Sequence, residues 1–150
     1  MDQEHVTNKL TIEFAKTLEI FNLSPLEARL FVYLYLSDEP LTLDNMSEAL
    51  GKSKTSMSTS ARQLSESNLI TRVWKKGVRK DLYEANTDLF NTFMISYIKQ
   101  LCSQINRQKK TIIDIENQVE NNQILQKQIH DIITFHSKME HLLESIKMNN

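Results

Sequence analysis

The feature that most constrains the fold of this chain is its scarcity of glycine, since only Gly51 and Gly77 occur in 150 residues. An average protein contains about 7 % glycine, and tight turns with positive φ favour this residue. A chain so poor in glycine cannot build the many turns of a β-sandwich or β-barrel, or a glycine-rich phosphate loop. We therefore expect a mainly helical protein, whose length suits one domain with an appended helical element.

Three further features exclude other classes of protein. No apolar run approaches the ~20 residues that span a bilayer, and the acidic start of the chain is not typical of a signal peptide. The single cysteine, Cys102, excludes an internal disulfide framework and favours a reducing cytoplasm. Its place in an apolar helical stripe favours a buried small residue over a redox sensor.

The formal net charge of −1 conceals an uneven distribution along the chain. Residues 1–50 carry nine acidic and three basic side chains, and residues 81–150 carry nine acidic and seven basic ones. Residues 51–80 carry eight basic side chains and one acidic, a local balance of +7. Such a cationic segment attracts phosphate, and the alternative is a solvated surface without a partner.

Apolar spacing and capping signals predict helices at residues 3–21, 25–37, 43–50 and 54–67. Ser24 is the expected N-cap of the second helix, with Pro25 at its first position. A short extended piece, residues 41–43, precedes the third helix. Gly51 follows that helix, as expected at a C-cap, and Ser53 can cap the fourth. Two short helices joined by a glycine-containing turn predict a helix-turn-helix unit.

The pattern changes after Asn68 and predicts a β-hairpin. Residues 69–74 and 79–85 are rich in strand-forming side chains, and residues 75–78 between them form a turn that contains Gly77. A cationic hairpin directly after a helix-turn-helix indicates a wing. We expect Trp74 to close the wing onto the core, with stacking on a ligand as the alternative. The winged helix-turn-helix domain is thus predicted at residues 23–86.

The rest of the chain, residues 87–150, is predicted to be helical and to dimerise. Apolar residues recur at spacings of three and four from Phe90 onward, residues 117–123 are a polar reversal or kink, and a heptad seam follows. So long an apolar stripe cannot be covered by the winged domain alone. Homodimerisation through these helices, with the N-terminal helix at residues 1–22 as part of the interface, is the simplest way to bury it.

The fourth helix has one face for the core and one for a partner. Met57, Ala61 and Leu64 form the buried face, and the opposite face carries short hydroxyl side chains and an arginine. Hydroxyls bind phosphate or base edges and arginine reads guanine in the major groove, while cations on a wing follow the backbone or enter the minor groove. The alternative is a plain polar surface, which the mediocre helix propensity of serine and threonine argues against. The predicted DNA-binding residues are Lys52, Ser53, Lys54, Thr55, Ser56, Ser58, Thr59, Arg62, Lys75, Lys76 and Arg79.

The sequence contains no catalytic constellation. His130, His136 and His141 lie close together, and His136 with Glu140 forms an i, i+4 pair that could bind a metal. A polar residue in a heptad seam more often tunes helix pairing than binds a metal. We therefore expect no enzymatic activity, no cofactor and no metal. The main alternative to a DNA-binding protein is a winged-helix module that binds only proteins, and a weaker alternative is an enzyme built on the histidine cluster.

Four motifs in chain order resemble the GbsR-type branch of the MarR-like winged helix-turn-helix regulators. The resemblance covers about residues 20–90, and it implies a homodimeric repressor that binds a pseudo-palindromic operator on double-stranded DNA. The motifs are LSPLEAR at residues 23–29, LSDEPLTL at 36–43, ALGKSK at 49–54 and RVWKKGVRKDLYEA at 72–85.

The same resemblance implies a small-molecule effector. Some members of this branch respond to choline or related quaternary ammonium compounds and control osmoprotectant genes for choline or glycine betaine. Such a cation is bound in an aromatic cage, for which Phe90, Phe93 and Tyr97 are the nearest candidates. Core packing explains these aromatic residues equally well, so both readings stay open.

Overall fold

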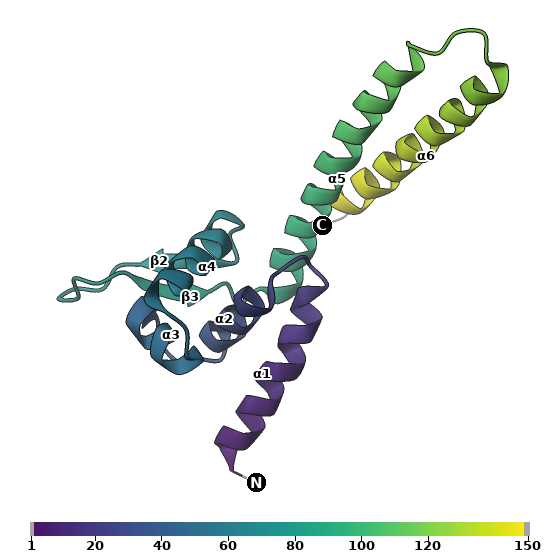
Figure 1. Ribbon diagram of the computed structural model, residues 1–150. Coiled ribbons are helices and arrows are strands. Elements are labelled where there is room, and N and C mark those ends of the chain that lie inside the picture. Colours follow the sequence, from purple (N-terminus) through teal and green to yellow (C-terminus); the bar gives the residue numbers. More distant parts are fainter. Residues whose placement is uncertain (1, 149–150) are drawn as a thin grey trace. The chain divides into compact units, whose positions relative to one another are not determined.

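The computed structural model describes residues 2–148. The chain forms two units, with the boundary after Phe93. We call residues up to Phe93 the winged unit and those from Met94 the helical hairpin. The elements, in chain order in Figure 1, are α1 (Gln3–Glu19), α2 (Pro25–Tyr35), β1 (Leu41–Thr42), α3 (Leu43–Leu50), α4 (Lys54–Glu66), β2 (Ile70–Val73), β3 (Leu82–Ala85), α5 (Leu89–Glu116) and α6 (Gln123–Met148).

The helix boundaries follow from local capping chemistry. The Ser24 hydroxyl accepts a hydrogen bond from the Glu27 amide at 3.1 Å, and the Glu27 carboxylate accepts one from the Ser24 amide at 2.7 Å. This reciprocal pair satisfies amides that the first turn of α2 leaves free. Thr42 and Asn45 form the same arrangement at the start of α3. The predicted second, third and fourth helices are confirmed, with the second ending two residues early and the fourth one residue early.

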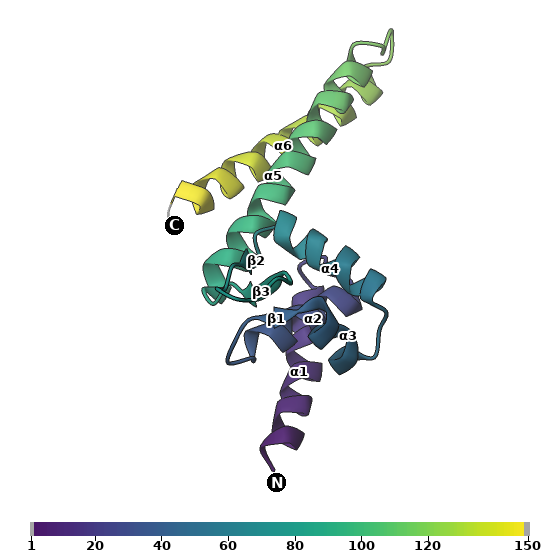
Figure 2. The ribbon, with the colours of Figure 1, turned by 90° about the vertical axis from the view of Figure 1, so that its left-hand side faces the viewer.

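The sheet of the winged unit is larger than the predicted two-stranded hairpin. Among the described residues it has three antiparallel strands in the order β1-β3-β2, and Leu41 pairs with Tyr83. The segment expected to be merely extended is therefore an edge strand, which lies beside β3 (Figure 2). The strands of the wing are also shorter than predicted. Val73 pairs with Leu82, so residues 74–81 form an eight-residue wing loop in place of a four-residue turn.

The core of the winged unit is centred on α2. Its side chains are apolar almost all round, and Leu30, Phe31 and Val32 are fully buried. The predicted inner face of α4 (Met57, Ala61, Leu64) is buried as well. Ala49 is exposed, contrary to expectation. In a helix as short as α3, the pair Met46 and Leu50, four residues apart, already fills the space toward the core.

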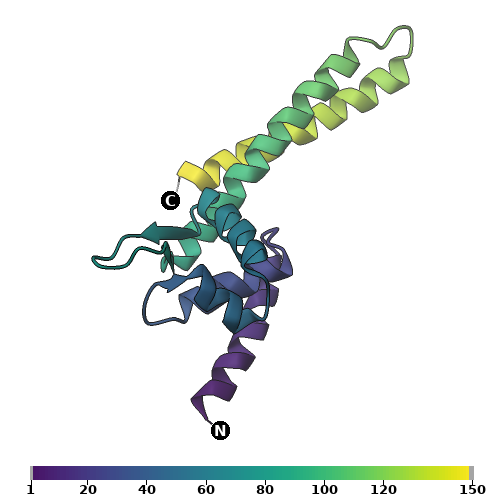
Figure 3. The same ribbon diagram turned by 60° about the vertical axis from the view of Figure 1, so that its left-hand side comes forward.

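The helical hairpin consists of the greater part of α5 and of α6. The two helices are antiparallel (Figures 1 and 3), and the reversal predicted at residues 117–123 is confirmed. Ile98, Ile129 and Leu143 are buried, and Lys109 of α5 forms an ion pair of 3.3 Å with Glu140 of α6. The heptad seam is thus only partly covered within one chain. Cys102 is half-buried, less than the sequence suggested.

None of the helices described between residues 2 and 148 combines the length and apolar character needed to cross a membrane.

Candidate nucleic-acid interface

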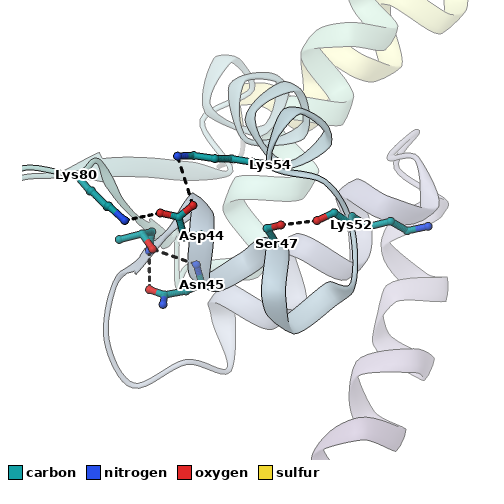
Figure 4. Close-up of polar contacts among 7 residues, drawn as sticks. Asp44, Asn45, Ser47, Lys52, Lys54 and Lys80 are labelled. Carbon is teal, nitrogen blue, oxygen red and sulfur yellow. Dashed lines mark hydrogen bonds and ion pairs between the residues drawn. The ribbon is translucent and has the colours of Figure 1, made fainter.

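The turn between α3 and α4 depends on Gly51. Gly51 has φ of +66°, in the left-handed region that side chains with a Cβ rarely adopt, and no atom would meet an added Cβ. The constraint is therefore the backbone angle and not the space. The Lys52 amide donates to the Ser47 carbonyl at 3.2 Å, and the Ser47 hydroxyl donates to the Lys52 carbonyl (Figure 4). These bonds fix the direction in which α4 leaves the turn.

The outer face of α4 is open to solvent as predicted. Ten of the eleven predicted DNA-binding residues are exposed, and Ser56 is half-buried. Some of the hydroxyls also have structural partners. The Ser53 hydroxyl accepts from the Ser56 amide at 3.1 Å and so caps α4, while the Thr59 hydroxyl donates to the Thr55 carbonyl at 3.1 Å. In contrast, no hydrogen bond within residues 2–148 engages the side chains of Ser58 or Arg62.

An acidic side chain that sequence reasoning did not single out ties the wing to both helices. The carboxylate of Asp44, in the first turn of α3, accepts from Lys80 of the wing loop at 2.5 Å and lies 3.4 Å from Lys54 of α4 (Figure 4). The hydrogen bonds from Lys80 and then Lys54 lower the pKa of Asp44 below its ordinary value of 3.8. Two of the cations in the +7 segment are thereby paired within the chain.

A second contact fixes the base of the wing. Arg72 of β2 lies 3.3 Å from the carboxylate of Asp81 and faces Tyr83 across the sheet. A hydrogen bond with Tyr83, and then the charge of Asp81, raise the pKa of Arg72. The cations farther along the loop differ. Lys75, Lys76 and Arg79 are exposed, and the residues that the structure describes offer them no ion pair.

The position of Trp74 contradicts the expectation that it closes the wing onto the core. Its side chain is 82 % exposed. The reason is that β2 ends at Val73, so Trp74 lies in the wing loop and is not held over the core by the strand ladder.

Comparisons with known proteins were made with this geometry in hand. No family model matches the chain. It is 32 % identical over 106 residues to the HTH-type transcriptional repressor OpcR of Bacillus subtilis, covering 71 % of this chain and 57 % of OpcR. It is 34 % identical over 79 residues to the HTH-type transcriptional repressor GbsR of the same organism, covering 53 % of this chain and 43 % of GbsR. The resemblance to the GbsR-type regulators is confirmed.

The chain spans little more than half the length of OpcR and less than half that of GbsR. The fold extends further than these matches. The crystal structure of a transcriptional regulator superposes with a TM-score of 0.66 at 18 % identity, covering 93 % of this chain and 94 % of that one. A mainly helical winged helix-turn-helix fold is therefore confirmed, and the likeness to GbsR-type proteins is a likeness to transcription regulators and not to enzymes.

The histidines of α6 have a structural setting in this GbsR-like chain. The His136 ring nitrogen Nδ1 lies 2.8 Å from the Ile132 carbonyl one turn earlier. Within residues 2–148, no three histidine, cysteine or acidic side chains come together as metal ligands would.

Proposed function

We propose that this chain is a sequence-specific DNA-binding transcription regulator, acting as a dimeric repressor on a pseudo-palindromic operator in the cytoplasm. One observation carries the proposal: the cations of the +7 segment gather on the exposed start of α4 and on the wing loop, with their side chains largely free of internal ion pairs. Unpaired cations on a fixed scaffold are what phosphate contacts require. In this account α4 enters the major groove and the wing follows the backbone beside it.

The dimer is supported by apolar surface that one chain leaves uncovered. Along α1 the stripe is buried at Leu18, but Val6 and Leu10 are 47 % and 50 % exposed. The N-terminal half of α1 extends beyond α2 (Figures 1 and 2). On α6, Phe135 and Leu142 are exposed as well. A second copy that covers these faces would present two α4 helices, which a two-fold dimer places about one helical turn apart on DNA.

The effector proposed from the family resemblance is a quaternary ammonium compound, and with it control of osmoprotectant genes. One of the three aromatic candidates does not fit this role. Phe93 is buried and packs edge-on against Phe31, with ring centroids 5.0 Å apart, so it is a core residue. Phe90 is exposed and remains a candidate for a cage.

Binding to the DNA upstream of the protein's own gene tests the proposal directly. In an electrophoretic mobility assay, we expect a shift at lower protein concentration than with a mixed-sequence duplex of equal length. A winged-helix module that binds only proteins would shift neither duplex, and equal shifts of both would contradict sequence specificity.

Arg62→Ala is expected to reduce sequence preference. Arg62 is exposed on α4 and can reach two acceptors of a guanine, a contact that contributes about 1–3 kcal/mol of discrimination. The affinity ratio between the upstream and mixed-sequence duplexes should fall about 10-fold or more in competition anisotropy. Gln63→Ala, next along the exposed face, is the control for general damage to α4. An unchanged ratio for Arg62→Ala would remove this residue from the reading face.

Asp44→Asn is expected to strengthen binding to any duplex by roughly 3- to 10-fold at low salt, because it frees Lys54 and Lys80 for phosphate and removes a negative charge from the interface. Asp38→Asn makes the same change of charge at an exposed position without a recorded ion pair, and should have a smaller effect. Weaker binding by Asp44→Asn would show instead that the carboxylate holds the wing in its binding position. Because the pKa of Asp44 is lowered, the clamp should persist at neutral pH and break only below the ordinary value near 3.8.

A further inference from the structure

Trp74 is the only tryptophan of the chain, and its exposure is unusual. At 82 % it is the most exposed large apolar side chain among residues 2–148. A tryptophan buries about 150–250 Å² when it packs, and its N–H usually finds a hydrogen-bond partner. In the described part of the chain, its side chain has neither a ring contact nor a hydrogen bond. The fold therefore leaves this large side chain unused.

The surroundings of Trp74 indicate the charge of its partner. It lines an open hollow of about 390 Å³ on the wing, together with Lys75, Arg79 and Lys80. The acid in this hollow, Asp81, is paired with Arg72. An exposed indole surrounded by cations suits a partner that is anionic and also offers an apolar face. The sugar–phosphate backbone of DNA has both, since each deoxyribose lies between two phosphates.

We infer that Trp74 is a DNA-contacting residue of the wing, with its indole packed on the deoxyribose edge of the groove and Lys75 and Arg79 on the adjoining phosphates. The inference rests on the proposed function. The indole ring covers the sugar, and its N–H can donate to a phosphate oxygen. The base pairs stay stacked in this arrangement, so the contact adds affinity for any duplex and carries no base preference.

Because the chain has a single tryptophan, its fluorescence reports on this contact alone. The probe is a mixed-sequence duplex of about three helical turns at low salt, and a label on the DNA gives binding independently by anisotropy. Without DNA, we expect the emission of a water-exposed indole that acrylamide quenches efficiently. Saturation with DNA should shift the emission to shorter wavelength and reduce acrylamide quenching at least about twofold.

Variants test whether the contact contributes to affinity. Trp74→Ala should weaken binding of the mixed-sequence duplex about 10-fold, within the range for aromatic contacts to nucleotides. Trp74→Phe, which keeps a ring, should stay within about threefold of the native protein. Ile124→Ala is the matched control, because Ile124 is a large apolar residue that is 75 % exposed on the helical hairpin. The melting temperature of all three should match that of the native protein.

The outcomes separate the inference from the proposed function. Anisotropy that shows binding while quenching of Trp74 stays unchanged would overturn the inference and leave DNA binding intact. So would a Trp74→Ala variant of native affinity, or an indole already shielded in the free protein at high concentration, which would assign Trp74 to a contact between copies. An absence of any anisotropy change would overturn both.

Discussion

Replacing Lys76 and Arg79 together with alanine should weaken binding to every duplex about 60-fold at about 0.1 M salt. Each phosphate contact releases counterions and contributes about 0.9 to the slope of log K against log salt, so two lost contacts remove about 1.8 log units. Both side chains are exposed on the wing loop and have no recorded ion pair. The loss should be the same for the upstream and the mixed-sequence duplex, because phosphate contacts do not read sequence. Anisotropy titrations of both duplexes measure it.

The control for this variant removes the same charge from the helical hairpin. Lys110 and Lys127 are exposed and have no recorded ion pair, so their double replacement with alanine should change the affinity much less. If the two double variants weaken binding equally, the effect is one of overall charge and the wing is not the contact. If only the affinity for the upstream duplex falls, the wing reads bases and its assignment to the backbone is wrong.

Phe31→Ala should lower the free energy of unfolding by about 3–5 kcal/mol, the range for truncating a buried phenylalanine. Phe31 is fully buried in α2, stacks on Tyr35 at 6.1 Å between ring centroids, and meets Phe93 edge-on at 5.0 Å. Since Phe93 lies in the first turns of α5, the cavity would loosen the packing of α5 onto the winged unit. Urea unfolding followed by circular dichroism measures the change.

Two further variants keep this prediction testable if Phe31→Ala does not fold. Phe31→Leu fills most of the same space and should lose clearly less stability. Phe135→Ala removes an exposed ring from α6 and should change stability by less than about 0.5 kcal/mol in a monomer. A loss below about 1 kcal/mol for Phe31→Ala would mean that α2 is not the centre of the core.

The sequence predicted most helices well because their signals are local. Ser24 and Gly51 act through atoms within a few residues of themselves, so their capping roles could be inferred without any tertiary information. The inner face of α4 was equally predictable from spacing alone. Ala49 was not, since which side of the short helix α3 is buried depends on what packs against it.

The wing shows where sequence reasoning fails. Strand-forming residues indicated the hairpin, but its length depends on where pairing stops, and that is decided between the strands. The register ends at Val73 and Leu82, which places Trp74 in the loop and reverses its expected role. Asp44 was missed for a related reason. Its partners Lys54 and Lys80 are 10 and 36 residues away, so no local pattern links them.

The salt dependence of DNA binding by the native protein tests the central claim most directly. With about four phosphate contacts for each protomer, the association constant for the upstream duplex should fall at least about 100-fold between about 50 and 200 mM salt. Anisotropy titrations at four or five salt concentrations give the slope. A steep, linear decrease is the predicted result. Binding that is insensitive to salt, or no binding at 50 mM, would contradict the assignment of α4 and the wing as a DNA-binding surface.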